Sequence, residues 1–395
     1  MHSYQHITDY QYIDTKADLN KACKKLADKA VIAFDTEFVR TQTLNPLLGL
    51  IQVFDGETVY LIDPVAISDL SEFSKILEQT DIIKIAHSCS EDLETLLHHL
   101  NVIPQPIFDT QFAAALLGLG VSVGYANLVE SVFNIKVDKG ESRTDWLQRP
   151  LSNAQCDYAL ADVTHLLALY EHMLVPIEEQ NKLTWVYDEI AHLAAKKQAV
   201  YPAELAYLSV KNNWKLRHKH LACLQKLAEW RMQTARREDK PLSFVLKETA
   251  LIELAYKIPQ ANPQLFECQH LYSKPAKLYG DSILKICRSV IDAPDEAMPK
   301  RVQRLTEFRD YKQALEKLKA LTEQISHEHS IPTTLFASKK QLNQVLKWCW
   351  FDLDELEAQA LKPDLLCSWR YNLLNPFIPQ LSAFLTGSHE VKRSI

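Results

Sequence analysis

Apolar runs of strand length occur only near the beginning of this 395-residue chain. Turns or helical patterns separate four such runs, which are predicted strands: Val31–Phe34, Leu50–Phe54, Val59–Ile62 and Ile82–Ala86. After about Thr184 the apolar residues recur at helical spacing instead, as they do around Leu224. We therefore predict a mixed α/β domain followed by domains that are entirely helical.

Helical patterns occur before, between and after the predicted strands. They cover Lys16–Ala30, Ser68–Gln79, Ser90–Leu100, Thr110–Leu117, Tyr125–Phe133 and Ser152–Glu179. The length indicates two or three domains, because a typical domain has about 100–200 residues. We expect domains at residues 1–200, 206–290 and 300–385, with the polar, proline-containing segment Asp292–Pro299 as a linker.

Composition excludes several classes of protein. The first residues lack the basic and apolar regions of a secretory signal, and no apolar run is long enough to cross a membrane. The eight cysteines are scattered without a C-x-x-C pair, which is typical of reduced thiols rather than of a disulfide framework or a zinc site. We expect a cytoplasmic monomer that binds no membrane.

Charge is distributed unevenly along the chain. The net charge of −6 divides into −14 for residues 1–205, +8 for residues 206–290 and 0 for residues 291–395. A basic segment within an acidic protein indicates an anionic partner, and nucleic acid is the commonest one. A solvated basic face without any partner is the alternative explanation.

Acidic residues stand at the ends of two predicted strands. Asp35 and Glu37 follow directly on the first predicted strand, and alternate residues of a strand point to the same face, so both carboxylates project together. Asp92 follows the fourth predicted strand and falls in the first turn of the next helix, for which Ser90 is the expected N-cap. Two adjacent anions repel each other, and a divalent cation removes that conflict.

A third acidic segment lies on a later helix. Tyr158 and Asp162 are four residues apart, so the phenol and the carboxylate share one helix face. Each of the three segments also has an ordinary structural explanation when it is taken alone. Such acid pairs are common on surface strands, Asp92 complements the helix dipole, and Tyr158 packs while Asp162 faces solvent.

In this order, the three segments resemble the exonuclease motifs of the DEDD superfamily, in its tyrosine-bearing branch. The resemblance to ribonuclease D extends to the residues around the motifs. They are Phe34-Asp35-Thr36-Glu37-Phe38-Val39-Arg40, Leu50-Ile51-Gln52-Val53, Ser90-Glu91-Asp92-Leu93, Asp109-Thr110-Gln111, Thr144-Asp145-Trp146-Leu147-Gln148-Arg149-Pro150-Leu151 and Tyr158-Ala159-Leu160-Ala161-Asp162-Val163. This implies that residues 1–200 form a ribonuclease H-like exonuclease domain, a mixed sheet flanked by helices.

The rest of the chain resembles the helical HRDC modules that ribonuclease D shares with helicases. The segments Trp214–Arg217 and Leu224–Arg231 resemble the first module, and Ala337–Asn343 with Trp348-Cys349-Trp350 resembles a second, more divergent copy. The resemblance therefore implies that an all-α HRDC domain occupies residues 206–290 and another occupies residues 300–385.

The resemblance also implies a two-metal mechanism with Mg²⁺ or Mn²⁺, because phosphodiester hydrolysis needs activated water and charge neutralisation. Asp35, Glu37 and Asp162 would hold one ion, Asp35 would bridge to the second, and Asp92 would serve that second ion. The pKa of a free tyrosine is near 10, so Tyr158 is expected to aim the attacking water rather than to act as a base. The expected product is a nucleoside 5′-monophosphate released from a free 3′ end.

Several further residues are candidates for binding substrate. Near the acids they are Thr36, Phe38, Gln52, His87, Trp146 and Arg149, and in the basic segment they are Lys215, Arg217 and Arg231. The leading hypothesis is a 3′→5′ exoribonuclease that trims structured RNA such as tRNA precursors. Two alternatives stay open: a DNA 3′→5′ exonuclease of the same superfamily, and a non-catalytic RNA-binding protein on a nuclease scaffold.

Overall fold

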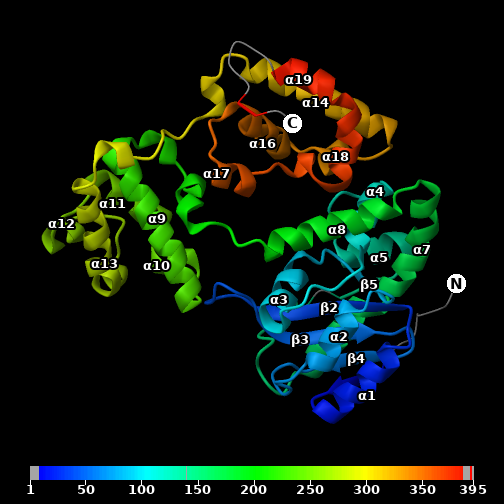
Figure 1. Cartoon of the computed structure of the whole chain (residues 1–395). Coiled ribbons are helices and arrows are strands. Elements are labelled where there is room, and N and C mark those ends of the chain that lie inside the picture. The colour runs from blue at the N-terminus through cyan, green and yellow to red at the C-terminus, as the bar shows by residue number, and fades with distance from the viewer. Residues whose placement is uncertain (1–8, 139, 386–391, 394–395) are drawn as a thin grey trace.

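The computed structural model describes residues 9–138, 140–385 and 392–393 (Figure 1). A six-stranded sheet in the order β1-β4-β3-β2-β5-β6 forms the centre of its N-terminal part. The strands are β1 (Tyr10–Ile13), β2 (Val31–Val39), β3 (Leu47–Phe54), β4 (Val59–Ile62), β5 (Ile83–Ala86) and β6 (Ile107–Asp109). The β2–β3 and β3–β4 pairs are antiparallel, whereas β1–β4, β2–β5 and β5–β6 are parallel. The prediction of a mixed sheet is confirmed.

The four predicted strands are all present, and the structure adds β1 and β6. The short edge strand β1 mixes polar and aromatic residues, and β6 has only three residues, so neither carries a clear periodic signal. Helices cover both faces of the sheet. They are α1 (Lys16–Leu26), α2 (Ser71–Glu78), α3 (Ser90–Leu100), α4 (Thr110–Leu116), α5 (Tyr125–Phe133), α6 (Asn153–Thr164), α7 (Leu166–Glu179) and α8 (Leu183–Gln198).

Two apolar cores flank the sheet. Ala33, Leu50 and Phe54 point to the face that α4, α6 and α7 cover, and their neighbours Ile32, Ile51 and Val53 point to the face that α1, α2 and α3 cover. This alternation follows from the pleat of the strands. It also determines the face on which the side chains of Asp35 and Glu37 lie, because these residues continue the alternation of Ala33.

The single helix predicted over 152–179 is wrong, because the structure has two helices that meet at His165. The Tyr125 hydroxyl is inserted at this junction. It donates to the carbonyl of Ala161 at 2.8 Å and accepts from the backbone N–H of His165 at 3.2 Å. In an unbroken helix those two backbone groups would bond to each other, and a side chain inserted there bends the chain.

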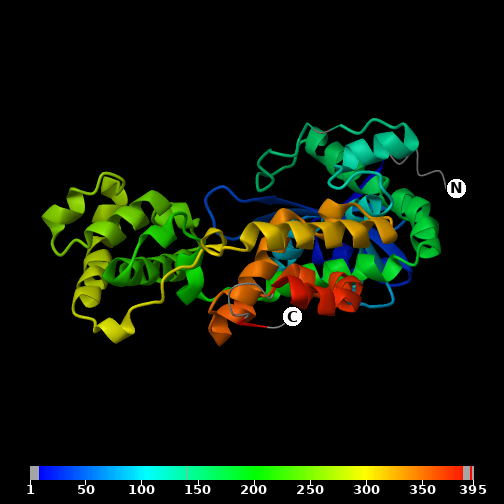
Figure 2. The same cartoon turned by 90° about the horizontal axis from the view of Figure 1, so that it is seen from above.

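The C-terminal half of the described chain is helical, as predicted. One unit has its own core and contains η1 (Ala203–Ser209), η2 (Asn213–Lys215), α9 (His218–Glu238), α10 (Leu242–Val245), α11 (Glu248–Lys257), α12 (Asn262–Phe266) and α13 (Ser273–Ile291). The rest comprises η3 (Asp295–Ala297), η4 (Leu305–Glu307), α14 (Tyr311–Glu328), α15 (Thr333–Phe336), α16 (Lys339–Trp350), α17 (Glu355–Ala360), η5 (Asp364–Leu366), α18 (Ser368–Leu374), η6 (Asn375–Phe377) and α19 (Ile378–Leu385). Figure 2 shows the α9–α13 unit to one side of the other two parts.

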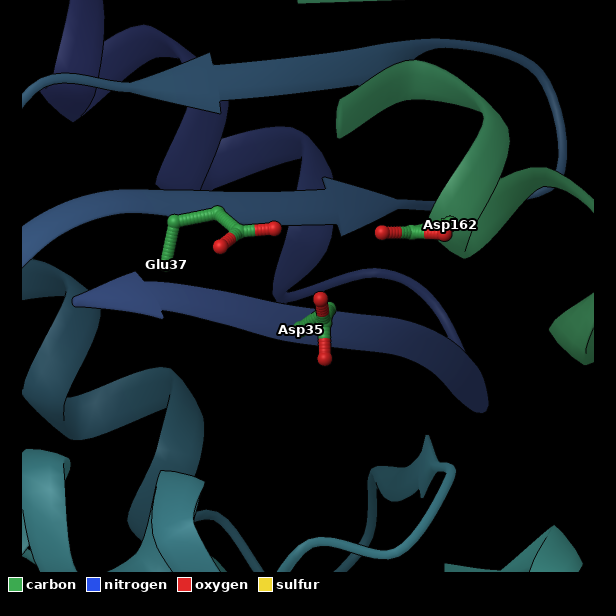
Figure 3. Close-up of side chains that lie close together, drawn as sticks. All are labelled: Asp35, Glu37 and Asp162. Carbon is green, nitrogen blue, oxygen red and sulfur yellow. The ribbon is translucent and has the colours of Figure 1, made fainter. Parts of the chain in front are cut away.

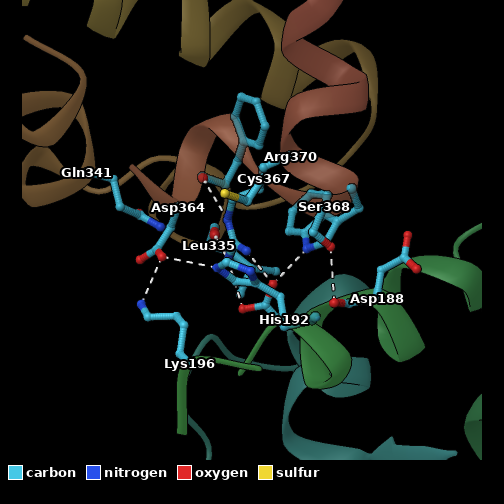
Figure 4. A network of polar contacts seen from close by, with 12 residues as sticks. Asp188, His192, Lys196, Leu335, Gln341, Asp364, Cys367, Ser368 and Arg370 are labelled. Atoms are coloured by element: carbon cyan, nitrogen blue, oxygen red, sulfur yellow. Dashed lines mark hydrogen bonds and ion pairs between the residues drawn. The ribbon is translucent and has the colours of Figure 1, made fainter. Parts of the chain in front are cut away.

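The α14–α19 unit shares its apolar core with the sheet domain. Trp369 of α18 stacks on Trp185 of α8, with ring centroids 5.2 Å apart. Around them, Asp364 accepts from Lys196 at 2.8 Å, and the Ser368 hydroxyl donates to the Asp188 carbonyl at 3.0 Å (Figure 4). These contacts join the two parts through both apolar and polar groups.

The α9–α13 unit contacts the sheet domain through the loop between β2 and β3. Asp239, the C-cap of α9, accepts from the backbone and side-chain nitrogens of Asn45 at 3.0 and 2.9 Å. Its carbonyl accepts from the backbone N–H of Leu44 at 3.2 Å. The loop that carries these residues is the direct continuation of β2, the strand that holds Asp35 and Glu37.

Within the described residues, none of the helices has the length and hydropathy needed to span a bilayer.

Candidate active site

Three carboxylates from two distant segments meet above the sheet (Figure 3). Asp35 and Glu37 project from β2, and Asp162 reaches them from α6. One oxygen of each of the three lies within 4.8 Å of the others. The structure thus brings together three of the four acids that the sequence singled out.

Asp92 lies beside this cluster but is held differently. It belongs to the first turn of α3, and one of its carboxylate oxygens accepts from the Thr36 backbone N–H at 3.1 Å and from the Thr36 hydroxyl. This backbone N–H is available because β2 pairs with β5 only as far as Ala33. The expected N-cap is wrong by one residue: Cys89 occupies that position, and its N–H donates to Asp109 at 2.8 Å.

The surroundings of the acids favour protonated carboxyl groups when no cation is present. Loss of solvation and the neighbouring charges of Asp162 and Asp92 raise the pKa of Glu37 to about 9. Loss of solvation raises the pKa of Asp162 to about 7 and that of Asp92 to about 6. The pKa of Asp35 is also raised, first by desolvation and then by the three neighbouring acids. Such a cluster releases protons when a cation binds.

Tyr158 lies one helical turn before Asp162, and its hydroxyl is close enough to that carboxylate for the two groups to shift each other's pKa. Burial and the nearby acids raise the pKa of Tyr158 well above that of free tyrosine, so the phenol stays neutral. Trp146 packs against it, with ring centroids 6.1 Å apart. Tyr158 therefore places a neutral hydroxyl beside the carboxylate cluster.

The loop before α6 is clamped to the sheet by Arg149. Its guanidinium donates to both oxygens of Asp63 at 2.7 and 2.6 Å and to the carbonyls of Gly49 and Trp146 at 2.6 and 2.9 Å. Ser152 then begins α6 with a capping box. These bonds anchor the N-terminal end of the helix that carries Tyr158 and Asp162.

Gly49 allows the loop before α6 to lie directly against β3. It is the extra residue of a bulge in β3, between the pairs Glu37–Leu50 and Phe38–Leu48. A Cβ at this position would lie 2.6 Å from the Trp146 carbonyl oxygen and 2.7 Å from the Trp146 Cβ. Only glycine lets the loop approach this closely. Sequence reasoning missed Gly49, Asp63 and Tyr125, and a glycine within an apolar strand pattern was the one available signal.

Several residues that were predicted to contact substrate are instead bonded to, or buried among, other parts of the protein. Both ring nitrogens of His87 have partners, the Thr110 hydroxyl at 2.9 Å and the Val123 carbonyl at 3.0 Å. Trp146 is 1% exposed, which makes it part of the core. Gln52 is fully buried, and Phe38 is half-buried on the last part of β2. Of these residues, Phe38 and His87 keep a partly exposed surface, and both ring nitrogens of His87 are already bonded within the protein.

The three candidates in the basic segment differ in exposure. Lys215 is exposed over the Trp214 ring, and Arg217 is half-buried, with donor bonds to the carbonyls of Trp214 and Leu216. Arg231 is 4% exposed and donates to the Leu246 carbonyl at 3.1 Å, so it belongs to the core of the α9–α13 unit.

Comparison with known proteins agrees with this arrangement. A family model described as "3'-5' exonuclease" matches residues 10–178. One for the HRDC domain matches residues 220–287, and one for the C-terminal HRDC domain of ribonuclease D matches residues 310–378. These matches and the helices observed above confirm the predicted fold class.

Several curated proteins named ribonuclease D are similar to this chain. Ribonuclease D of Shewanella sp. (strain ANA-3) is 38% identical over 366 residues, covering 93% of this chain and 92% of the relative. Ribonuclease D of Escherichia coli K12 is also 38% identical over 366 residues, covering 93% and 96%. The crystal structure of E. coli RNase D, described as an exoribonuclease involved in structured RNA processing, matches with a TM-score of 0.89 at 37% identity, covering 97% of this chain and all of that one. The chain belongs to the ribonuclease D family.

Proposed function

We propose that this protein is a 3′→5′ exoribonuclease that hydrolyses RNA stepwise from a free 3′ end and releases nucleoside 5′-monophosphates. The convergence of Asp35, Glu37 and Asp162 on one point, with Tyr158 beside them, carries this proposal. Membership of the ribonuclease D family and the match to a 3′→5′ exonuclease model support it.

The donor set fits Mg²⁺ or Mn²⁺. All the converging atoms are carboxylate oxygens, which hard divalent cations prefer, and no thiol or imidazole belongs to the cluster that the described residues form. Asp35, Glu37 and Asp162 would hold one ion, and Asp92 would complete the site for a second. When bound, the ions neutralise phosphate charge and lower the pKa of water.

The protein's own groups then orient the reaction. The neutral Tyr158 hydroxyl would point a water molecule at the terminal phosphate, and Asp162, which lies beside that hydroxyl, would help to hold it in place. Thr36 holds the Asp92 carboxylate through its backbone and side chain, so its role is to position an acid and not to grip a base.

The α9–α13 unit would hold the body of the substrate. Of its fifteen lysines and arginines between residues 206 and 290, only Arg231 is buried; the others are exposed or half-buried. The E. coli relative is described as acting in structured RNA processing, which supports structured RNAs such as tRNA precursors as substrates. We further propose that the protein acts as a cytoplasmic monomer.

The test uses purified protein with a 5′-labelled tRNA precursor and a single-stranded DNA of equal length. We expect RNA shortening from the 3′ end in Mg²⁺ or Mn²⁺, mononucleotide products, and no reaction in chelator or with Asp35→Asn. Preferential digestion of the DNA would favour a DNA exonuclease, and RNA binding without any cleavage would favour a non-catalytic binding protein. Either result would overturn the proposal.

A further inference from the structure

A fully buried amide lies next to the carboxylate cluster. Gln52 of β3 pairs directly with Asp35 of β2 in the antiparallel register. We propose that Gln52 is a positioning residue for the ion-binding carboxylates: its amide supplies a hydrogen bond that holds Asp35 or Asp162 in the geometry that binds divalent cations. This inference rests on the proposed function and assigns Gln52 a role different from the substrate contact expected from sequence.

Gln52 has no hydrogen-bond partner among the residues that the structure describes. Its exposure is 0%, and neither its amide nitrogen nor its amide oxygen bonds to any of them. In the part of the chain that the structure describes, no other buried side chain has two such atoms. A buried polar group without a partner lowers stability, so packing alone does not explain an amide here.

The register determines the direction in which this amide points. Directly opposed residues of an antiparallel pair extend to the same face, with Cβ atoms about 4.5–5.5 Å apart. Gln52 therefore lies on the face of Asp35 and Glu37. Leu50 and Phe54, two residues to either side of it, belong to the apolar core on that face. Residues of α6 cover the same core, so the amide is enclosed between Asp35 and the helix that bears Asp162.

The chemistry of the neighbours identifies what the amide would bind. A carboxylate that coordinates a cation has lone pairs left over, and metal-ligating carboxylates are normally held by donors from an outer shell. The side-chain NH₂ of glutamine has two hydrogens to donate. Among the described residues neither Asp35 nor Glu37 receives a side-chain hydrogen bond, whereas Asp92 accepts from Thr36 and Asp162 lies beside the Tyr158 hydroxyl. Because Gln52 pairs with Asp35, its amide is placed to supply a donor to Asp35.

The test compares Gln52→Met with the wild type. Methionine is close in length and volume but has no amide, so it removes the hydrogen-bonding atoms without opening a cavity. Leu61→Met is the matched control, because Leu61 pairs with Gln52 on the side away from Asp35 and lies on the same buried face. The measurements are the melting temperature in chelator, the affinity for Mn²⁺ alone by titration calorimetry, and kcat and KM on RNA.

For Gln52→Met we expect an unchanged or higher melting temperature in chelator, Mn²⁺ binding weakened about tenfold and a lower kcat with unchanged KM. Leu61→Met should leave Mn²⁺ affinity unchanged. Wild-type Mn²⁺ affinity in Gln52→Met, or a loss of metal-free stability, would overturn the inference and assign Gln52 a structural role. If the wild type bound Mn²⁺ without cleaving RNA, the proposed function would fail, while the Mn²⁺ titration would still decide the role of Gln52.

Discussion

Arg149 and Asp63, 86 residues apart in sequence, form a two-pronged ion pair with N···O distances of 2.7 and 2.6 Å. The same guanidinium donates to the carbonyls of Gly49 and Trp146, so one side chain joins β3, the end of β4 and the loop that leads into α6. The position of α6 determines where Tyr158 and Asp162 lie, and the ion pair therefore supports the site from a distance.

Replacing this arginine should lower both stability and activity. In Arg149→Ala the 2%-exposed Asp63 loses its cation, and we expect unfolding to become easier by about 3 kcal/mol. Arg149→Lys keeps the positive charge but not the two-pronged geometry, so its stability should lie between that of Arg149→Ala and that of the wild type. Chemical denaturation and kcat on RNA are the measurements. An Arg149→Ala protein with wild-type stability would contradict this account of the loop.

Tyr158 should matter for the chemical step and not for cation binding. In Tyr158→Phe the ring still packs on Trp146, but the hydroxyl next to Asp162 is lost. We expect kcat to fall by about 10²-fold, a loss typical of one positioned proton-handling group, while Mn²⁺ affinity by calorimetry stays near that of the wild type. Asp35→Asn is the comparison and should lose both RNA cleavage and Mn²⁺ affinity. Equal losses of Mn²⁺ affinity in the two variants would argue against this role.

Much of this arrangement is predictable from local sequence. Strand alternation places Asp35 and Glu37 on one face, and the bounds predicted for α3 and α5 are those observed. The break at His165 is not predictable in this way, because it depends on Tyr125, 40 residues earlier in the chain.

Long-range contacts also decide which candidate residues remain free. His87, Arg149 and Arg231 have the chemistry of phosphate ligands, yet each is engaged by groups from other elements. Periodicity does not contain that information. The convergence of Asp162 with β2 was foreseeable only through the resemblance to known exonuclease motifs.

The metal-free protein should lose stability as pH rises. Folding raises the pKa of Asp162 to about 7 and of Glu37 to about 9, so the folded state holds protons that the unfolded chain releases at lower pH. The stability from these protons is complete below about pH 4 and is lost between about pH 4 and pH 9.

Melting curves in chelator from pH 5 to pH 9 measure this loss. Between pH 5 and about pH 7, where the Asp162 proton is lost, we expect the unfolding free energy to fall by about 1 kcal/mol per pH unit more in the wild type than in Asp162→Asn, and Mn²⁺ to abolish the difference. If the unfolding free energy of the two proteins depended on pH in the same way, folding would not raise the pKa of Asp162 as described.

The contact between Asp239 and the β2–β3 loop should affect long substrates selectively. Asp239 has a backbone φ of 46°, so glycine is the replacement that removes the side chain without strain. Asp239→Gly loses the acceptor for both nitrogens of Asn45, which loosens the basic unit from the catalytic strand. We expect KM to rise severalfold for a tRNA precursor and to stay constant for a short oligonucleotide.

Asp239→Asn is the control for that experiment, because asparagine keeps an acceptor oxygen and tolerates this backbone conformation. It should behave like the wild type on both substrates. Equal KM changes on long and short RNA in Asp239→Gly would place the effect in the catalytic domain instead.

Anomalous diffraction at the manganese edge, from crystals grown with Mn²⁺, tests most directly whether acids from separate segments build one cation site. We expect a strong peak bounded by the carboxylates of Asp35, Glu37 and Asp162, which should be absent from crystals of Asp35→Asn. Manganese bound elsewhere, with none between these three side chains, would contradict it.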